Sequence, residues 1–384
     1  MVCKLWFAEA NSVKSYQKRY PVGINYFNNK KRSWIWRCVL FGEDKYIMDP
    51  NEDEMFKYLK IEDELSSVYE RMGITEYYDE IIRDVSRTFP KLRDFQKKEN
   101  QTKMLRTLFK ISYAFPEVGY CQGMNYLVGI LLYAFDFNVE QVYSSIISIL
   151  IKWEYEDIYN KDLTKLKEMC FIFNELIKEY LPELYNQVFY NKYEVNAENK
   201  ITSELFAIQW FLTLFIYDIA DTDYAINSVY ILDNIIIHDT NCNFNINVYK
   251  IAISLLSRIF KDFKLGNDVE IIHILEFIRQ RSKYILTTVS EIEELLNESK
   301  NLLLPETLLQ KIYVKYKQMN ITKENTDEKS LSDKKNVNGR TRETLSKLLR
   351  KYKLFSYNQN GNKNSIYVDD DDSVPSPFHP YFSI

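Results

Sequence analysis

The chain has 384 residues, of which 46% are hydrophobic and 27% are charged. This balance is typical of a globular protein and excludes a wholly disordered or collagen-like chain. The formal net charge of −4 argues against a general nucleic-acid binder, because such proteins usually carry an excess of basic residues.

Helices account for the patterning along most of the chain. Glycine and proline are scarce, with nine of each, which favours long helices over a turn-rich β architecture. Apolar residues recur at spacings of three and four, as in amphipathic helices. No alternating strand pattern occurs, so the predicted fold class is all-α. The expected helices, in chain order, are one that ends before Pro90, a buried one over 126–135, and further ones over 163–181, 206–217, 248–260, 269–278 and 290–304, the last capped by Ser290.

The composition changes near residue 319. Residues 320–340 contain almost no apolar side chain, so a linker is expected there. In residues 340–355, leucine and aromatic residues are interspersed with arginine and lysine. This segment could be a basic amphipathic helix that touches a membrane or a partner, although a solvated helix docked on its own domain is the more ordinary interpretation. We expect the Asn- and Asp-rich end of the chain to be disordered.

Several classes of site and location are excluded by the sequence. The five cysteines form no C-x-x-C pair and the three histidines are far apart, so neither a disulfide framework nor a metal site is predicted. Cys121 could be a nucleophile, but no histidine is near it in sequence. The longest apolar run, 126–135, is shorter than the roughly 20 residues of a membrane span. The N-terminus lacks the apolar stretch of a secretory signal, so we expect a cytoplasmic protein.

A first segment that could carry chemistry runs from Ile81 to Pro90. We expect a helix with Thr75 as its N-cap, because acidic residues follow in its first turns. Arg87 points away from the expected apolar stripe. Asp84 lies one turn earlier, where its carboxylate can hold the guanidinium. Taken alone, this is also the pattern of an ordinary surface ion pair. The stripe is made of Tyr78, Ile81, Ile82 and Val85.

A second segment, residues 119–125, reads Gly-Tyr-Cys-Gln-Gly-Met-Asn and leads into the apolar run. Gln122 and Asn125 lie where the buried helix is expected to begin. The two glycines beside them tolerate unusual backbone angles. A glutamine amide can offer a donor and an acceptor to a water molecule. Taken alone, Gln122 could equally cap or brace the turn.

The order and spacing of the two motifs are specific. D-x-x-R-T-F-P begins at Asp84 and Y-C-Q-G-M-N begins at Tyr120. Together they strongly resemble the TBC domain family, whose members activate the GTPase reaction of Rab-type small GTPases. Departures from the family pattern, such as Leu232 in place of a tryptophan, concern packing or the partner surface. The likeness continues in Gly23-Ile24, Arg32, Trp36, Leu40-x-Gly42, Gln209–Phe215 and Asp233.

The resemblance implies an all-α, multi-helix domain that acts on a GTP-loaded Rab. It implies that Arg87 is an arginine finger inserted in trans and that Gln122 is a second finger, which orients the attacking water. Asp84 would orient Arg87. The chain would hold no cofactor or metal, because the GTP and Mg²⁺ belong to the partner. The remaining supporting residues would be Tyr120, Gly123 and Asn125.

The resemblance covers about residues 20–318, which leaves residues 1–19 as an N-terminal arm and 319–384 as a low-complexity tail. We expect no nucleic-acid partner, while a peripheral membrane contact could recruit the protein to endomembranes. One alternative is a non-catalytic TBC-type scaffold that binds a GTP-loaded Rab or another trafficking partner. Retention of both finger residues favours the activator. A second alternative, an unrelated helical adaptor, would place Arg87 and Gln122 far apart.

Overall fold

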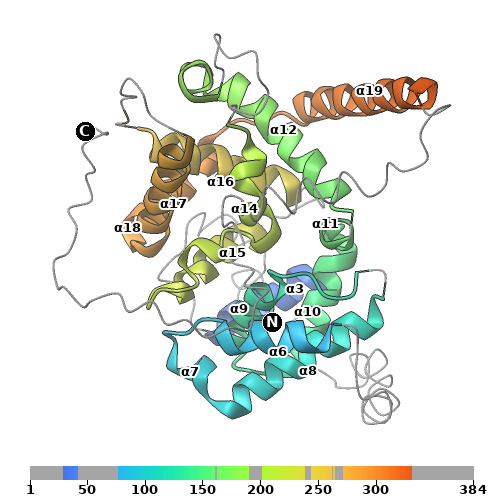
Figure 1. Cartoon of the computed structure of the whole chain (residues 1–384). Helices are drawn as coiled ribbons and strands as arrows, with labels where there is room; N and C mark the ends of the chain where they lie inside the picture. Colours follow the sequence, from blue (N-terminus) through green and yellow to red (C-terminus); the bar gives the residue numbers. More distant parts are fainter. Residues whose placement is uncertain are drawn as a thin grey trace, which may run out of the picture.

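The computed structural model describes residues 29–41, 77–116, 118–160, 162–189, 201–237, 244–261, 263 and 271–330. Within these ranges the regular elements are helices and no strand occurs, which confirms the all-α prediction. A group of N-terminal helices forms the lower part of the molecule in Figure 1. It consists of α3 (Asn29–Phe41), α6 (Tyr78–Arg87), α7 (Arg93–Gln96), α8 (Lys98–Ala114), α9 (Met124–Ala134) and α10 (Val139–Lys152).

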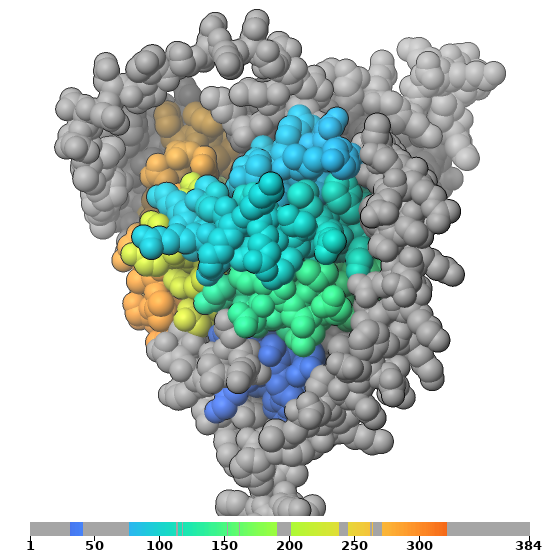
Figure 2. Space-filling view, turned by 90° about the horizontal axis from the view of Figure 1, so that it is seen from below, coloured from blue at the N-terminus to red at the C-terminus, as the bar shows by residue number. Residues whose placement is uncertain are grey.

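The later helices form the upper part, and α15 lies between the two groups (Figure 1). Short helical turns, among them η4 (Tyr217–Ile219) and η5 (Ala225–Asn227), connect some of them. The space-filling view in Figure 2 shows α8 in cyan, then α10 in green and α3 in blue, which agrees with the packing of α10 against both. The later helices are α11 (Tyr155–Tyr159), α12 (Thr164–Tyr180), α13 (Pro182–Leu184), α14 (Ala207–Thr213), α15 (Ser228–Ile237), α16 (Phe244–Ile259), α17 (Ile271–Thr287), α18 (Val289–Asn301) and α19 (Glu306–Ser330).

The boundaries of several expected helices need correction. The helix expected over 248–260 is Phe244–Ile259, and the one expected over 269–278 is Ile271–Thr287. The segment 206–217 is not one helix, because α14 ends at Thr213 and the next two residues, Leu214 and Phe215, have φ values of 49° and 66°. Positive φ angles are incompatible with a right-handed helix. The helix expected over 290–304 begins one residue earlier, at Val289, and its cap residue is Thr288 rather than Ser290.

The predicted linker is partly helical. Helix α19 continues to Ser330, through the first residues of the segment 320–340. No glycine or proline occurs between residues 306 and 330, so nothing in the chain stops the helix once its first turns pack on α12. The rest of the linker, the segment 340–355 and residues 1–19 lie outside the described residues. None of the described helices is both long enough and apolar enough to cross a membrane.

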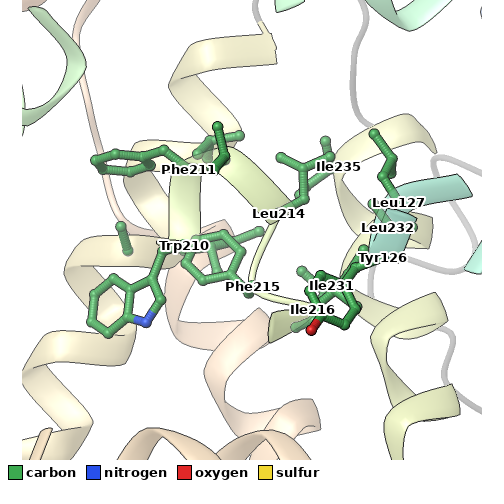
Figure 3. Packing of buried hydrophobic residues seen from close by; sticks show 14 of the residues in the cluster. Tyr126, Leu127, Trp210, Phe211, Leu214, Phe215, Ile216, Ile231, Leu232 and Ile235 are labelled. Atoms are coloured by element: carbon green, nitrogen blue, oxygen red, sulfur yellow. The ribbon is translucent and has the colours of Figure 1, made fainter. Parts of the chain in front are cut away.

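The core is built around α9, which is apolar on all sides. All its residues except Tyr133 are buried, including Leu127 and Val128. Its Tyr126 and Leu127 lie near the chain that leaves α14 and near the apolar residues of α15 (Figure 3). Because α9 follows directly after residues 119–123, its burial fixes the position of the loop that carries Gln122.

A buried ion pair ties the first described helix to this core. The guanidinium of Arg32 on α3 donates to both carboxylate oxygens of Asp233 on α15, each at 3.0 Å. The indole nitrogen of Trp36 donates to the same carboxylate at 2.9 Å. All three side chains are buried. Three residues that carry the family resemblance therefore form one structural contact.

Replacing Asp233 by alanine should lower the free energy of unfolding by about 3–5 kcal/mol, because Arg32 would remain buried without its carboxylate. Chemical denaturation measures this change. Asp223→Ala is the matched control, since Asp223 is exposed and lies 3.9 Å from the exposed Lys91. The control should change the free energy by less than about 0.5 kcal/mol. Equal effects of the two substitutions would contradict the structural role of Asp233.

Candidate functional site

Helix α6 presents a different face to the core from the one its apolar residues suggest. Ile81, Asp84 and Val85 are buried, whereas Tyr78 and Ile82 are exposed. The buried face shares Ile81 and Val85 with the predicted stripe but is rotated from it by about 60°, which brings Asp84 inside. A helix buries a carboxylate only where partners compensate its desolvation, and Asp84 has such partners. The helix begins at Tyr78 with Tyr77 as its cap residue, not with the predicted Thr75, which lies outside the described residues.

Asp84 uses both carboxylate oxygens. One oxygen lies 2.6 Å from a guanidinium nitrogen of Arg87. The other accepts a hydrogen bond of 2.6 Å from the hydroxyl of Tyr120. The side chain of Asp84 is 2% exposed, whereas that of Arg87 is 45% exposed. The expected contact between Asp84 and Arg87 is thus present, and a buried anion orients a cation that faces solvent.

A chain of hydrogen bonds joins the two motifs. The amide of Asn125 donates to the hydroxyl oxygen of Thr88 at 2.8 Å, and Thr88 donates to the backbone carbonyl of Asp84 at 2.6 Å. The backbone N–H of Gly123 donates to the side-chain oxygen of Asn125 at 3.0 Å. The segment that carries Gln122 is therefore attached to the end of α6. This excludes the adaptor alternative, in which the two segments would lie apart.

Two glycines allow the loop between these segments to fit. Gly119 and Gly123 have φ values of 60° and 117°, which other residues rarely adopt. A Cβ atom on Gly119 would lie 2.3 Å from the ring of Tyr77, and one on Gly123 would lie 3.2 Å from Leu212 and Thr213 at the end of α14. The loop is therefore held between the start of α6 and the end of α14. On both sides the backbone of a loop glycine packs against side chains of the neighbouring helix end.

Gln122 differs from its neighbours because its amide makes no hydrogen bond with any residue that the structure describes. Its side chain is only partly buried. Tyr120, Gly123 and Asn125 use their polar atoms inside the protein. The capping and turn-bracing interpretation of Gln122 is therefore not supported, and its amide is available to bind a water or a partner.

The chain after Arg87 is anchored by a strained residue. Phe89 has a φ of 48°, and its ring lies against Gly129 of α9, where a Cβ would be 2.6 Å away. The same ring contacts Phe95 and Tyr126, with centroids 4.9 and 5.8 Å apart. Thr88 and Phe89 were not predicted to be supporting residues. The sequence did offer a signal for them, because both residues belong to the T-F-P part of the first motif, on which the family resemblance rests.

Burial sets the protonation of the groups around the site. Burial, together with the nearby Asp84, holds the pKa of Tyr120 well above its usual value, so the hydroxyl stays protonated and donates. Burial also raises the pKa of the Cys121 thiol to about 12. A thiol in this state is not a nucleophile at neutral pH. In the part of the chain that the structure describes, no group of three His, Cys, Asp or Glu residues could hold a metal ion.

Comparison with known proteins identifies the family and the fold. Residues 29–265, more than half of the chain, match the Rab-GTPase-TBC domain family. The chain belongs to that family. Its fold is similar to the crystal structure of the Ypt/Rab-GAP domain of Gyp1p, with a TM-score of 0.52 and 15% sequence identity over 72% of this chain and 89% of that domain.

Two relatives show how much of a larger protein the match covers. TBC1 domain family member 4 of Mus musculus is 29% identical over 187 residues, which are 48% of this chain and 13% of the mouse protein. Rab GTPase-activating protein eat-17 of Caenorhabditis elegans is 32% identical over 151 residues, which are 39% of this chain and 15% of the nematode protein. The chain thus matches less than a fifth of the length of either relative.

Replacing Tyr120 by phenylalanine should lower the free energy of unfolding by about 1.5–3 kcal/mol, because the buried carboxylate of Asp84 would lose a charge-assisted hydrogen bond. Chemical denaturation again provides the measurement. Tyr224→Phe is the matched control, since Tyr224 is 57% exposed, and its effect should stay within about 0.5 kcal/mol. If Tyr120→Phe were as silent as the control, the hydrogen bond would not stabilise the site.

Proposed function

We propose that the chain is a GTPase-activating protein for a Rab-type small GTPase in its GTP-bound state. In this proposal Arg87 is the arginine finger and Gln122 is the glutamine finger. One observation carries it: a buried carboxylate orients an exposed arginine at the end of α6, and hydrogen bonds attach the segment of Gln122 to the same place. Membership of the Rab-GTPase-TBC domain family supports the partner class.

The geometry of Arg87 and Gln122 suits the two contributions that a GTPase alone lacks for fast GTP hydrolysis. The transferred phosphoryl group needs stabilisation of its developing charge and a water in line with the leaving group. A guanidinium is always charged and binds phosphate oxygens bidentately, which suits Arg87 to the first task. The free amide of Gln122 suits the second, because it can accept from and donate to the water.

Asp84 would contribute by positioning rather than by touching the nucleotide. An arginine in water samples many rotamers, and ordering it on binding costs free energy. The Asp84 carboxylate restricts Arg87 before the partner arrives while leaving the side chain 45% exposed. Tyr120 in turn holds the carboxylate. The end of α6 adds a favourable helix dipole for a cation in its last turn.

The GTP and Mg²⁺ of the reaction would come with the GTPase, so the chain would supply side chains alone. Recruitment from the cytoplasm to endomembranes through residues 340–355 stays a prediction, since that segment lies outside the described residues. The scaffold alternative makes a different prediction, namely stable binding of the GTP-loaded Rab without faster hydrolysis. An activator binds the GTP-loaded form weakly and tightens with a transition-state mimic.

The test uses the Rab whose GTP hydrolysis the wild-type protein accelerates most in a panel. We expect Arg87→Ala to lower that acceleration by about 10³-fold or more. Gln122→Ala should also reduce the rate, because the attacking water would lose its positioning group. Multiple-turnover hydrolysis gives both values. Arg106→Ala is the matched control, since Arg106 is an exposed arginine on α8, and it should keep the wild-type rate.

Two results would contradict the proposal. The first is a folded wild-type protein that accelerates no Rab in a broad panel. The second is acceleration that survives Arg87→Ala and Gln122→Ala unchanged. Stable capture of a GTP-loaded Rab in the first case would support the scaffold alternative.

A further inference from the structure

A small pocket of about 130 Å³ opens beside Arg87. Tyr126 of α9 and Tyr217 of η4 form part of its wall, with their ring centroids 5.5 Å apart. Helix α17 packs against η4 and adds Arg279 and Lys283. Two cations from a late helix are thereby brought to the same pocket as the candidate finger.

The acidic residues of the pocket are already occupied. The side chain of Asp218 is partly buried, and its carboxylate accepts from the indole nitrogen of Trp210 at 2.8 Å and from the hydroxyl of Ser282. Asp221 accepts from the ammonium of Lys283 with both oxygens, at 2.8 and 3.0 Å. Both carboxylates are therefore held by donors within the protein, Asp221 by the cation Lys283 and Asp218 by two neutral groups.

Among the described residues, Arg279 makes the longest ion pair of the three pocket cations, and the charge of Asp218 also acts on it. Its side chain is 66% exposed. Its ion pair is with Glu276, one turn earlier, at 3.9 Å, and that carboxylate also accepts from Gln280. Arg87 is held by Asp84 at 2.6 Å and Lys283 by Asp221. A carboxylate that entered the pocket would therefore find the guanidinium of Arg279 available.

The size of the pocket decides what kind of ligand fits. Pockets for small molecules usually measure about 300–1,000 Å³, so 130 Å³ is too small for a nucleotide. It is large enough for one side chain. The tyrosine rings can pack against a short methylene stem while the cations face its charge.

We propose that this pocket receives an acidic side chain, aspartate or glutamate, from the surface of the GTPase partner, and that Arg279 binds its carboxylate. This inference rests on the proposed function, because insertion of Arg87 would bring the GTPase to this side of the domain. Arg279 is then a specificity-determining residue. A GTPase with an acidic residue at this point is accepted, and one with a basic residue there is repelled by the guanidinium of Arg279.

The test is the steady-state kinetics of the best-accelerated GTPase with wild-type protein, Arg279→Glu and Arg281→Glu. The last is the matched control: it makes the same charge change on the same helix, but Arg281 lies over the ring of Tyr284 and outside the pocket. We expect Arg279→Glu to raise KM about tenfold or more and to keep kcat within about twofold. Arg281→Glu should change neither value by more than about twofold.

A charge swap identifies the partner residue. Exposed acidic residues of the GTPase are changed to arginine one at a time, and each variant is tested against wild-type protein and Arg279→Glu. We expect one GTPase variant to be a poor substrate for the wild type and to regain acceleration with Arg279→Glu.

Three outcomes would overturn the inference while leaving the proposed function intact. Arg279→Glu could match Arg281→Glu, it could lower kcat at unchanged KM, or no charge-reversed GTPase could be rescued by it. Failure of the proposed function looks different, because the wild-type protein would then accelerate no GTPase, and this inference would fall with it. Unfolding curves of each variant confirm that it is folded.

Discussion

A carboxylate inside a protein is costly unless its charge is compensated, and the site depends on how this chain meets that requirement at Asp84. One oxygen is compensated by Arg87 and the other by Tyr120. The first contact holds an arginine at the protein surface. The second connects α6 to a loop that lies more than thirty residues later in the chain. A single buried charge thus sets both the orientation of the cation and the position of the loop beside it.

The surrounding structure keeps this arrangement rigid. Helix α9 is buried along almost its whole length, and the loop before it packs closely against Tyr77 and α14 at two glycines with positive φ. Asn125 links the first turn of α9 to Thr88, directly after Arg87. No residue in the described ranges hydrogen-bonds the side-chain amide of Gln122. Two polar groups of different chemistry are therefore presented on a support that has little freedom to move.

The parts of the fold that follow from local pattern were predictable. Helix α12 has a regular apolar spacing and ends where Pro182 stops it, and α9 is apolar throughout. The end of α14 was not predictable, because Leu214 has a positive φ, a conformation that a leucine in the sequence does not signal. The buried face of α6 was misjudged for a related reason. Apolar periodicity counts only apolar residues, whereas Asp84 is buried through a partner that is distant in sequence.

In the candidate site, too, some features could be predicted from the sequence and others could not. The two motifs made Arg87, Gln122 and Asp84 candidates from the sequence, because their order and spacing resemble those of one family. The hydrogen bonds between the motifs needed coordinates. Arg279 had no sequence signal at all, since it lies on an ordinary amphipathic helix nearly two hundred residues after Arg87 and reaches the pocket only through the packing of α17.

The positioning of Arg87 by Asp84 is tested most directly by a double-mutant cycle. Single-turnover GTP hydrolysis by the responsive Rab is measured with wild-type protein, Asp84→Asn, Arg87→Ala and the double variant. If Asp84 acts through Arg87, Asp84→Asn lowers the rate in the wild-type background and has no further effect once Arg87 is alanine. If Asp84→Asn lowers the rate by the same factor in both backgrounds, Asp84 acts independently of Arg87 and this explanation of the site is wrong.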